Sequence, residues 1–472
     1  MSRFTWPLPI RHLIRLCLNC SIVLLIPSLA VAQDPSETSF AAGGHHSLFV
    51  RSDGTALACG LNEYGQLGNH TTVNRYIPVE VMQEVKAVAA GDNHSLFLKT
   101  DGSVWACGLN DRGQLGDGTD TTRISPVQVM TDVTAIAAGG DHSLFLKSDG
   151  TVWASGDNQY GQLGDRTTED RFTPVPALID IQAMSAGGLH NLFLKKNGIL
   201  WSVGSNFFGQ LGNGNNTSSV NPYKLMTDVA GMAAGYYHTL ILKKDGTVWA
   251  CGNNLNGQLG DGGTESKASP VQIMSGVGIS AVAAGWYHSL FIREDGRVVA
   301  TGDNEFGQLG DGTWRMQTNP KQVWYVRDAF AIAGGSTFSL YLTEDGSAWS
   351  VGQNDTGQLG IGIQPDKGRP VFVRDGIMTR PEGWVRDPQH GYEYYMGNGW
   401  SFNATMGFIH EAASGWLYNE KVGYFYFSGT DIQQGAWIYL GETKRWAWLT
   451  ESGSGWFYYL NGTRDSFRTS GP

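Results

Sequence analysis

The stretch GLNDRGQLGDGT, residues 108–119, contains a phrase that decides the fold. The core of this phrase, G-x-N-x-x-G-Q-L-G, occurs seven times, and its GQLG glycines stand at positions 65, 113, 161, 209, 257, 307 and 357. The spacing is 48 residues four times and then 50 residues twice. A fixed period of this length predicts a repeat protein in which each unit packs against its neighbours.

The second repeat shows what one unit contains. Residues 85–91, 94–100, 103–108 and 125–129 are short apolar runs of the kind that form strands. Asp101-Gly102, between the second and third runs, predicts a two-residue hairpin turn that requires positive φ. Seven units of four antiparallel strands, with no helical pattern, predict an all-β chain: a seven-bladed β-propeller of four-stranded antiparallel blades.

Positions that are the same in every repeat are interpreted as scaffold, because an active site needs one unsymmetrical cluster. Leu67 and its counterparts are expected to fill the blade interfaces, and the repeated asparagines to bond loop backbone. One histidine of each of the first six repeats is expected to be half-buried and to bond the neighbouring blade. These are His46, His94, His142, His190, His238 and His288, with Phe338 in the seventh repeat.

The cysteines and one set of tryptophans follow the repeat in the same way. Cys59, Cys107 and Cys251 occupy one equivalent position and are expected to be small buried residues, not a disulfide framework or metal site. A second equivalent position is expected to lie in the core or at a blade interface. It holds Trp105, Trp153, Trp201, Trp249 and Trp349.

The combined pattern AAGxxHSLFLxxDGxVWAxGxNxxGQLGDGT resembles the repeat of the regulator of chromosome condensation family, over residues 39 to about 378. The resemblance implies a seven-bladed propeller. The founding member of that family is a nucleotide exchange factor that binds chromatin, a role that a secretory signal and an acidic chain argue against. Secreted bacterial relatives compare better, and one type, a proteinaceous β-lactamase inhibitor, binds its target through one propeller face.

Two positions per repeat vary and fall on one face: the pair before each histidine and the pair before each GQLG. Repeats 4 to 6 place aromatic residues there, and Trp314 lies close by in the longer loop of repeat 6. Aromatic side chains at variable loop positions are typical of protein-binding hot spots. The predicted partner-binding residues are Phe207, Phe208, Tyr236, Tyr237, Trp286, Tyr287, Phe306 and Trp314. The alternative is that half of these rings pack against neighbouring loops.

The amino-terminal residues have the pattern of a cleaved secretory signal, residues 1–32. Arg3, Arg11 and Arg15 precede an apolar run that ends in Ala30-Val31-Ala32. Removal of these three arginines takes the net charge from −10 to −13. An acidic chain without a basic patch argues against nucleic-acid binding. We expect a secreted monomer, periplasmic, cell-surface or extracellular, without a membrane span after cleavage.

Residues 381–472 differ in composition from the predicted propeller, residues 33–380. Of residues 382–472, 22 are aromatic, and glycine followed by an aromatic residue recurs every eight residues from 383 to 423. This spacing suits a strand plus a turn and predicts a small aromatic-rich all-β module. The module is loosely similar to Gly-Trp-rich repeats that bind wall choline or glucans. Its aromatic residues either fill a small core or bind a glycan, with Trp400, Trp416, Trp437 and Trp456 as the candidates.

Three functions compete on these observations. The first is a secreted, non-catalytic propeller that binds a protein partner through one face. The second is an envelope protein held to a cell-wall polymer or glycan by its carboxy-terminal module. The third, an enzyme with a site built from dispersed loops, has neither a nucleophile motif nor metal-ligand spacing in its favour. The sequence therefore predicts a binding protein with no cofactor.

Overall fold

The computed structural model describes residues 39–344 and 346–373, together with nine strands between residues 394 and 466. The chain divides into two compact units, residues 1–378 and 379–472. The predicted signal segment, residues 1–32, lies outside the described residues. None of the described residues forms a helix long and apolar enough to cross a membrane.

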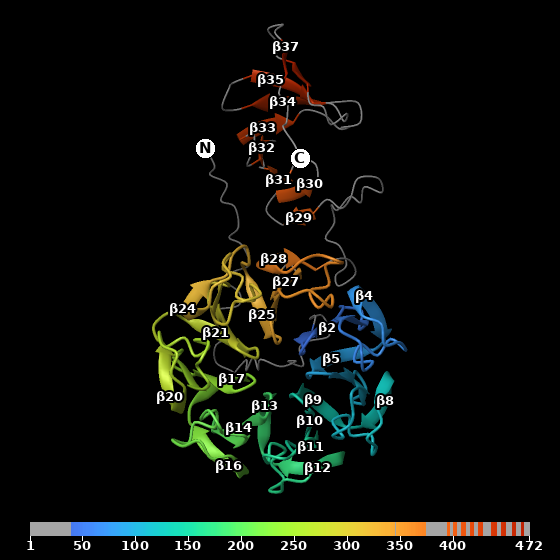
Figure 1. Cartoon of the computed structure of the whole chain (residues 1–472), viewed down its shortest axis with the longest axis vertical. Helices are drawn as coiled ribbons and strands as arrows, with labels where there is room; N and C mark the ends of the chain where they lie inside the picture. The colour runs from blue at the N-terminus through green and yellow to red at the C-terminus, as the bar shows by residue number, and fades with distance from the viewer. Residues whose placement is uncertain are drawn as a thin grey trace, which may run out of the picture. The chain divides into compact units, whose positions relative to one another are not determined.

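The first unit is a seven-bladed propeller around a central channel (Figure 1). Blades 1 to 4, in chain order, consist of these strands: β1 (Phe40–Ala42), β2 (His46–Val50), β3 (Ala56–Gly60) and β4 (Arg75–Met82); β5 (Val85–Ala90), β6 (His94–Lys99), β7 (Val104–Gly108) and β8 (Arg123–Met130); β9 (Val133–Ala138), β10 (His142–Lys147), β11 (Val152–Gly156) and β12 (Arg171–Leu178); β13 (Ile181–Ala186), β14 (His190–Lys195), β15 (Leu200–Gly204) and β16 (Ser219–Met226).

Blades 5 to 7 complete the ring with β17 (Val229–Ala234), β18 (His238–Lys243), β19 (Val248–Gly252) and β20 (Lys267–Met274); β21 (Ile279–Ala284), β22 (His288–Arg293), β23 (Val298–Gly302) and β24 (Gln317–Gln322); β25 (Ala329–Gly334), β26 (Phe338–Thr343), β27 (Ala348–Gly352) and β28 (Lys367–Phe372). Each blade is one antiparallel sheet of four strands that are consecutive in the chain. The sequence prediction of this fold is confirmed.

The hairpin turn inside each blade is one residue longer than predicted. In blade 2, Lys99 N donates to Ser103 O at 2.9 Å, so the loop contains Thr100, Asp101 and Gly102. Only Gly102 has positive φ, at 82°, whereas Asp101 does not. The aspartate acts through its side chain instead: Oδ1 accepts from Ser103 N at 2.8 Å. The two-residue prediction was wrong because an Asp-Gly pair suits both turns.

Apolar side chains of adjacent blades form the core at every interface. Between blades 1 and 2, Leu67 is fully buried beside Leu48 of one blade and Phe97 and Cys107 of the next. Trp105 is half-buried at the edge of the same cluster. The expected roles of the repeated leucines, cysteines and tryptophans are confirmed at this interface, and Cys59, Cys107 and Cys251 are free thiols.

The repeated histidines form a hydrogen-bond relay between blades. His46 Nε2 lies 2.9 Å from Ser95 Oγ of blade 2, and Ser95 Oγ donates to Gln66 O of blade 1 at 2.6 Å. Because the serine proton goes to the carbonyl, Nε2–H of the histidine is the donor to the serine. Burial lowers the pKa of His46 to about 3, so the ring is neutral. The histidines are therefore fully buried, not half-buried, but they do bond the next blade.

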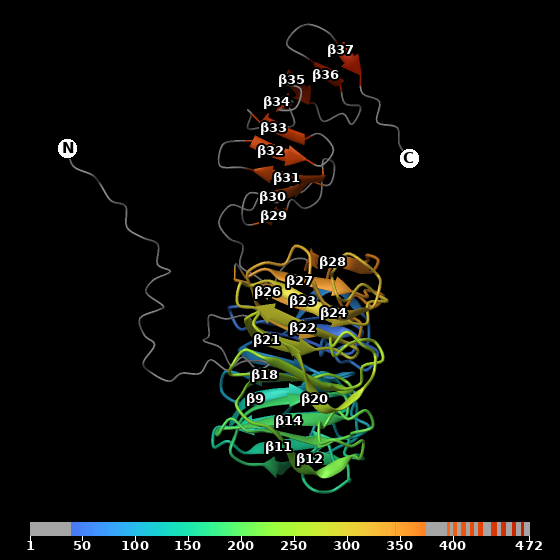
Figure 2. The ribbon, with the colours of Figure 1, turned by 90° about the vertical axis from the view of Figure 1, so that its left-hand side faces the viewer.

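The ring closes by packing of blade 7 on blade 1, without exchange of a strand between blades. Phe338 takes the place of the histidine here and shares an apolar cluster with Phe49 and Leu57. Ser47 Oγ still donates to Gln358 O at 2.6 Å. Seen from the side, the strands of the blades run across the ring from one face to the other (Figure 2).

The second unit is also built of strands, as the sequence predicts. Seven of them pair in chain order as one antiparallel sheet: β29 (Tyr394–Met396), β30 (Trp400–Asn403), β31 (Gly407–Glu411), β32 (Trp416–Asn419), β33 (Gly423–Phe427), β34 (Ala436–Leu440) and β35 (Arg445–Leu449). The remaining two, β36 (Trp456–Tyr458) and β37 (Arg464–Ser466), pair with each other.

Candidate functional site

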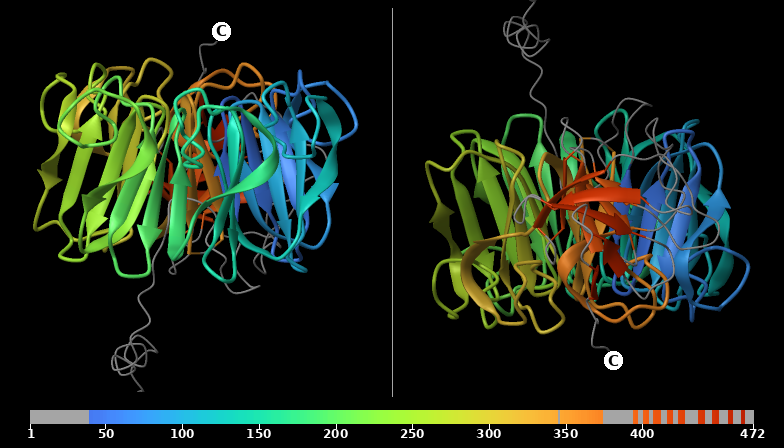
Figure 3. Two further views of the ribbon diagram at one scale, coloured as in Figure 1. Left: turned by 90° about the horizontal axis from the view of Figure 1, so that it is seen from below. Right: turned by 90° about the horizontal axis from the view of Figure 1, so that it is seen from above.

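The variable loops of all seven blades gather on one face of the propeller. They are the loops that join the first strand of a blade to the second and the third to the fourth. Figure 3 shows the strands of the blades running between the two faces of the ring, with loops at each face. In blade 2 these two loops are tied together where Leu109 N donates to Asn93 O at 2.9 Å. Asn110 supports the longer loop: its Oδ1 accepts from Leu115 N, and its Nδ2 donates to Thr119 O. We call this surface the variable face.

A closed ring of backbone hydrogen bonds surrounds the channel at this face. The first residue of each variable pair donates its N–H to a carbonyl of the next blade. Examples are Asp92 to Gly140 O at 3.1 Å and Trp286 to Gly335 O at 3.1 Å, and Ser336 to Gly44 O closes the circle. The loops that carry the candidate residues are therefore held by the scaffold.

Glycines in this ring leave room for the side chains of other blades. A Cβ atom on Gly188 would lie 2.6 Å from the ring of Tyr236, and one on Gly140 would lie 3.3 Å from Asp92 Oδ2. Tyr236 thus lies over blade 4, and the carboxylate of Asp92 lies over blade 3. Both side chains occupy space that any larger residue at the two glycines would fill.

The aromatic side chains of blades 3 to 6 form two neighbouring groups of ring contacts, joined in the chain at Phe207-Phe208, and we call them together the aromatic arc. Ring centroids are 5.1 Å apart for Phe208 and Tyr237, and 4.7 Å apart both for Tyr236 and Tyr237 and for Tyr236 and Trp286. Tyr287 lies 6.5 Å from Tyr237 and 6.4 Å from Trp286, whereas Tyr160 and Phe207, 5.2 Å apart, form a separate pair. The members of the arc are Tyr160, Phe207, Phe208, Tyr236, Tyr237, Trp286 and Tyr287.

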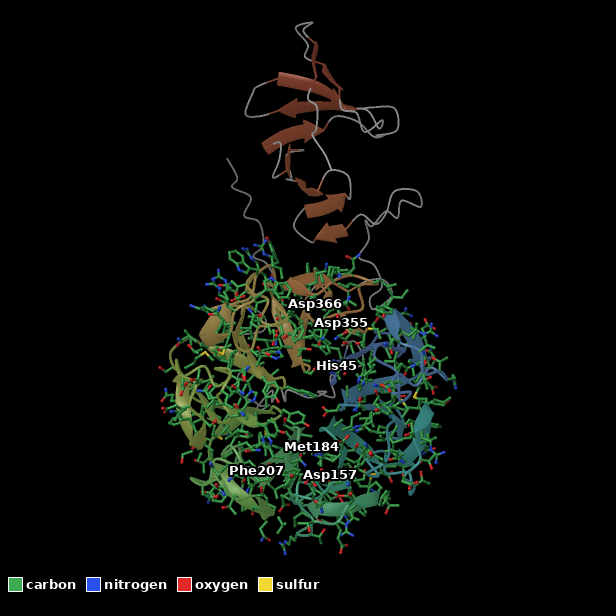
Figure 4. All side chains as sticks on the ribbon, in the orientation of Figure 1. His45, Asp157, Met184, Phe207, Asp355 and Asp366 are labelled. Atoms are coloured by element: carbon green, nitrogen blue, oxygen red, sulfur yellow. The ribbon has the colours of Figure 1, made fainter. Side chains whose placement is uncertain are left out.

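Members of the arc differ in exposure, so some of them fill the channel mouth. Phe207 is 52% exposed at the outer end of the arc. Tyr236 and Trp286 are only half-buried but contact each other near the channel, and Trp286 lies 6.2 Å from His45 of blade 1. Figure 4 places Phe207, His45 and Asp157 around the channel on three different blades. The arc therefore has an exposed outer part and a packed inner part.

Two predicted residues lie apart from the ring contacts of the arc. Phe306 is half-buried, and within the described residues it makes no ring contact. Trp314 is 52% exposed and lies over Gly368 of β28, where a Cβ would approach its Cε2 to 3.2 Å. The loop that carries Trp314 was predicted to be longer than the equivalent loops of other repeats, but it has the same length. The extra residues of repeat 6 lie instead at 323–328, after a shortened β24.

Those extra residues carry aromatic side chains that sequence reasoning missed. Trp324 and Tyr325 are 54% and 56% exposed, and Arg369 lies 5.9 Å from the Tyr325 ring centroid. Trp324 Nε1 donates to Asp311 O at 2.6 Å, so the indole is fixed against the β23–β24 loop. The longer period of repeat 6 was the signal for this segment.

Acidic residues lie beside the aromatic arc, and they too were missed although they stand at variable positions. Burial raises the pKa of Asp92 to about 8, and the charge of Asp141 raises it as well. Hydrogen bonds from Trp286 and Tyr236 act in the opposite direction. Burial also raises the pKa of Asp141 to about 6, with further contributions from the charges of Asp111 and Asp157.

In the described part of the chain these acids form no ion pair, although the charge of Arg112 opposes the effect of burial on the pKa of Asp141. Within the described residues, no ion pair includes Asp92, Asp111, Asp141 or Asp157. Arg112 pairs instead with Asp170, with 3.4 Å between Nη1 and Oδ2. The same residues contain no group of His, Cys, Asp and Glu arranged to hold a metal ion.

The four tryptophans predicted for glycan binding all fall within strands of the second unit. Trp400 lies in β30, Trp416 in β32, Trp437 in β34 and Trp456 in β36. Their backbone register is defined, and Trp437 pairs with Trp448 of β35. Their side chains lie outside what the structure describes.

Two family models match the first unit. The model of the RCC1-like domain matches residues 22–273, and that of the regulator of chromosome condensation (RCC1) repeat matches residues 279–308 and 331–358. The first match covers more than half of the chain. No curated protein matches this sequence.

Solved structures share the propeller fold at low sequence identity. Yeast RCC1 (Prp20), in its complex with Kap60, is 22% identical, with a TM-score of 0.61 over 68% of this chain and 83% of that chain. Human WBSCR16 is 24% identical, with a TM-score of 0.62 over 68% of this chain and 94% of that chain. Prp20p of Saccharomyces cerevisiae, reported with its binding to Gsp1p and histones, is 23% identical, with a TM-score of 0.61 over 68% and 85%.

Proposed function

This chain belongs to the family of RCC1-like domains, and on that premise we propose that it is a secreted, non-catalytic protein that binds a protein partner through the variable face. Structural neighbours in the family bind proteins: Kap60, Gsp1p and histones for the yeast protein. Their partners do not transfer at this identity. The partner of this chain has to be inferred from its own surface.

The aromatic arc is the observation that carries the proposal. Scaffold positions repeat around the ring, whereas the arc occupies only blades 3 to 6 and lies on loops held by backbone hydrogen bonds. Clustered rings on preorganised loops lose little side-chain entropy when a partner covers them. The exposed part of the arc, with Phe207 at its end, is where contact begins.

Affinity capture with the full chain tests this proposal. The bait is exposed to envelope and culture-medium fractions of the source organism. One variant carries Phe207→Ala and Tyr237→Ala. The matched control carries Phe172→Ala and Tyr223→Ala, which also remove one Phe and one Tyr, 39% and 41% exposed on outer strands β12 and β16. A partner lost only with the first variant supports the proposal, and equal capture by both contradicts it.

The second candidate function is attachment to a wall polymer through the carboxy-terminal unit. Its seven-stranded sheet carries an aromatic residue on every strand, from Tyr394 on β29 to Trp448 on β35. Retention of the full chain on purified cell walls, compared with a Trp400→Ala/Trp416→Ala variant, tests it. Unchanged retention of the variant contradicts a role for these two residues.

We also propose that residues 1–32 are removed during export. The basic start, apolar run and Ala-Val-Ala end support this. Mass spectrometry of the exported protein should find Gln33 at the amino terminus, and an intact Met1 would contradict the proposal.

A further inference from the structure

The acidic and aromatic sides of the channel mouth face each other across the ring. Asp92 and Asp141 belong to blades 2 and 3, whereas Tyr236 and Trp286 belong to blades 5 and 6. Asp92 Oδ2 lies 3.3 Å from the Cβ position of Gly140, and the ring of Tyr236 lies over Gly188 of the next blade. Hydrogen bonds from Trp286 and Tyr236 lower the pKa of Asp92 against the larger effect of burial. The charge of Asp92 also acts on Tyr237 and Tyr287, because it contributes, after burial, to the raised pKa of each phenol. The carboxylate of Asp92 is therefore close to the side chains of Trp286 and Tyr236.

This arrangement costs the free protein stability. A half-buried carboxylate beside aromatic rings loses hydration, and within the described residues neither Asp92 nor Asp141 forms an ion pair, although the charge of Arg112 acts on Asp141 from a distance. His45, on the far side of Trp286, does not supply one, because burial lowers its pKa. Residues that oppose folding in the free state are characteristic of sites whose favourable partner arrives from outside.

Carboxylates next to ring faces attract one kind of group most strongly. A guanidinium ion bonds carboxylate oxygens through its planar fork and also stacks on aromatic rings. A neutral or anionic group would leave the carboxylates without compensation. Charge complementarity thus selects the occupant of this surface.

We propose that the protein partner presents an arginine side chain to the channel mouth, where its guanidinium binds Asp92 and Asp141 and stacks on the inner rings of the aromatic arc. This inference rests on the proposed function and specifies the chemistry of the partner. Apolar residues that flank the arginine contact the outer part of the arc, around Phe207 and Phe208.

The test uses the full chain labelled with 5-fluorotryptophan, and Trp286→Phe assigns the ¹⁹F resonance of Trp286. The probes are a blocked Leu-Arg-Leu tripeptide and the same peptide with the neutral isostere citrulline. We expect the arginine peptide to shift the Trp286 resonance and the citrulline peptide to bind at least about tenfold more weakly. Equal affinity for both, or no shift at about 20 mM arginine peptide, would overturn the inference.

Substitutions distinguish binding by the two carboxylates from a general effect of net charge. Asp92→Asn and Asp141→Asn should each weaken the arginine peptide at least about threefold. Asp120→Asn removes one charge from an exposed position of the β7–β8 loop and should leave binding unchanged. Unaltered resonances of the blade tryptophans such as Trp105 and Trp153, without peptide, show that each variant is folded. Full affinity in Asp92→Asn would contradict the inference.

Failure of the inference and of the proposed function give different results. If binding of the partner depends on Phe207 and Tyr237 but not on Asp92 and Asp141, the variable face is still the binding site and the arginine inference is wrong. If capture of the partner does not depend on Phe207 and Tyr237, the proposed function is wrong, whichever peptide binds.

Discussion

At the scale of the residue, Asp92 determines how the site responds to pH. An unfolded aspartate titrates near 4, whereas burial raises the pKa of Asp92 in the fold to about 8. The folded state therefore keeps this proton as pH rises, and the stabilising contribution, full below pH 4, is lost between pH 4 and pH 8. The groups around it are Asp141, Tyr236, Tyr237, Trp286 and Tyr287.

Replacement of Asp92 by asparagine should remove this loss. Asp92→Asn should melt at a temperature close to wild type at pH 5 and on the order of 2 °C higher at pH 8.5. Thermal unfolding followed by circular dichroism measures the difference, and Asp120→Asn corrects for net charge. A difference that is the same at pH 5 and pH 8.5 would show that Asp92 is already ionised in the fold at pH 5.

The buried histidines give a second prediction at this scale. Phe338 shows that the site accepts a benzene ring, so His94→Phe should lose mainly the 3.0 Å hydrogen bond to Ser143 Oγ, about 1 kcal/mol. His94→Ala leaves a cavity and should cost about 3 kcal/mol. Urea unfolding compares the two variants. Equal costs would mean that the ring contributes no packing.

At the scale of the element, two glycines of blade 2 should differ sharply. Gly102 has φ of 82° in an open turn, where a Cβ meets Val133 O only at 3.4 Å, so Gly102→Ala should cost about 1 kcal/mol. A Cβ on Gly91 would lie 2.2 Å from His94 Cε1 and 2.5 Å from Gly139 O. Gly91→Ala should therefore cost well over about 3 kcal/mol, in the same urea assay. A similar cost for both would contradict the close blade contact.

The sequence carries the elements better than the contacts between them. Alternation in runs such as residues 94–99 predicts the strands, because one face of each must be buried. The turn at Asp101-Gly102 was predicted one residue short, since the pair fits two loop lengths. Contact between Asp92 and Trp286 depends on blades far apart in the chain and on the space that Gly140 and Gly188 leave. No local pattern carries that information, so the aromatic residues were found and the acids were not.

At the scale of the whole molecule, the ring has one weak interface, between blades 7 and 1. The first six blades each donate a histidine hydrogen bond to the next blade, and Phe338 cannot. Because blades are not joined by strand exchange, side-chain packing and the bonds of Ser47 and Ser336 hold the ring closed.

Native-state hydrogen exchange should reveal this interface. Amides of β1 and β2, and of β25 and β26, should exchange through local opening before their equivalents in blades 2 to 5, because fewer interactions must be broken. Peptide-resolved mass spectrometry measures the order. The outer part of the aromatic arc, around Phe207 and Phe208, lies on blade 4, away from the weak interface, so opening of the ring should not disturb it. Earlier exchange in β13 and β14 than in β1 and β2 would contradict both statements.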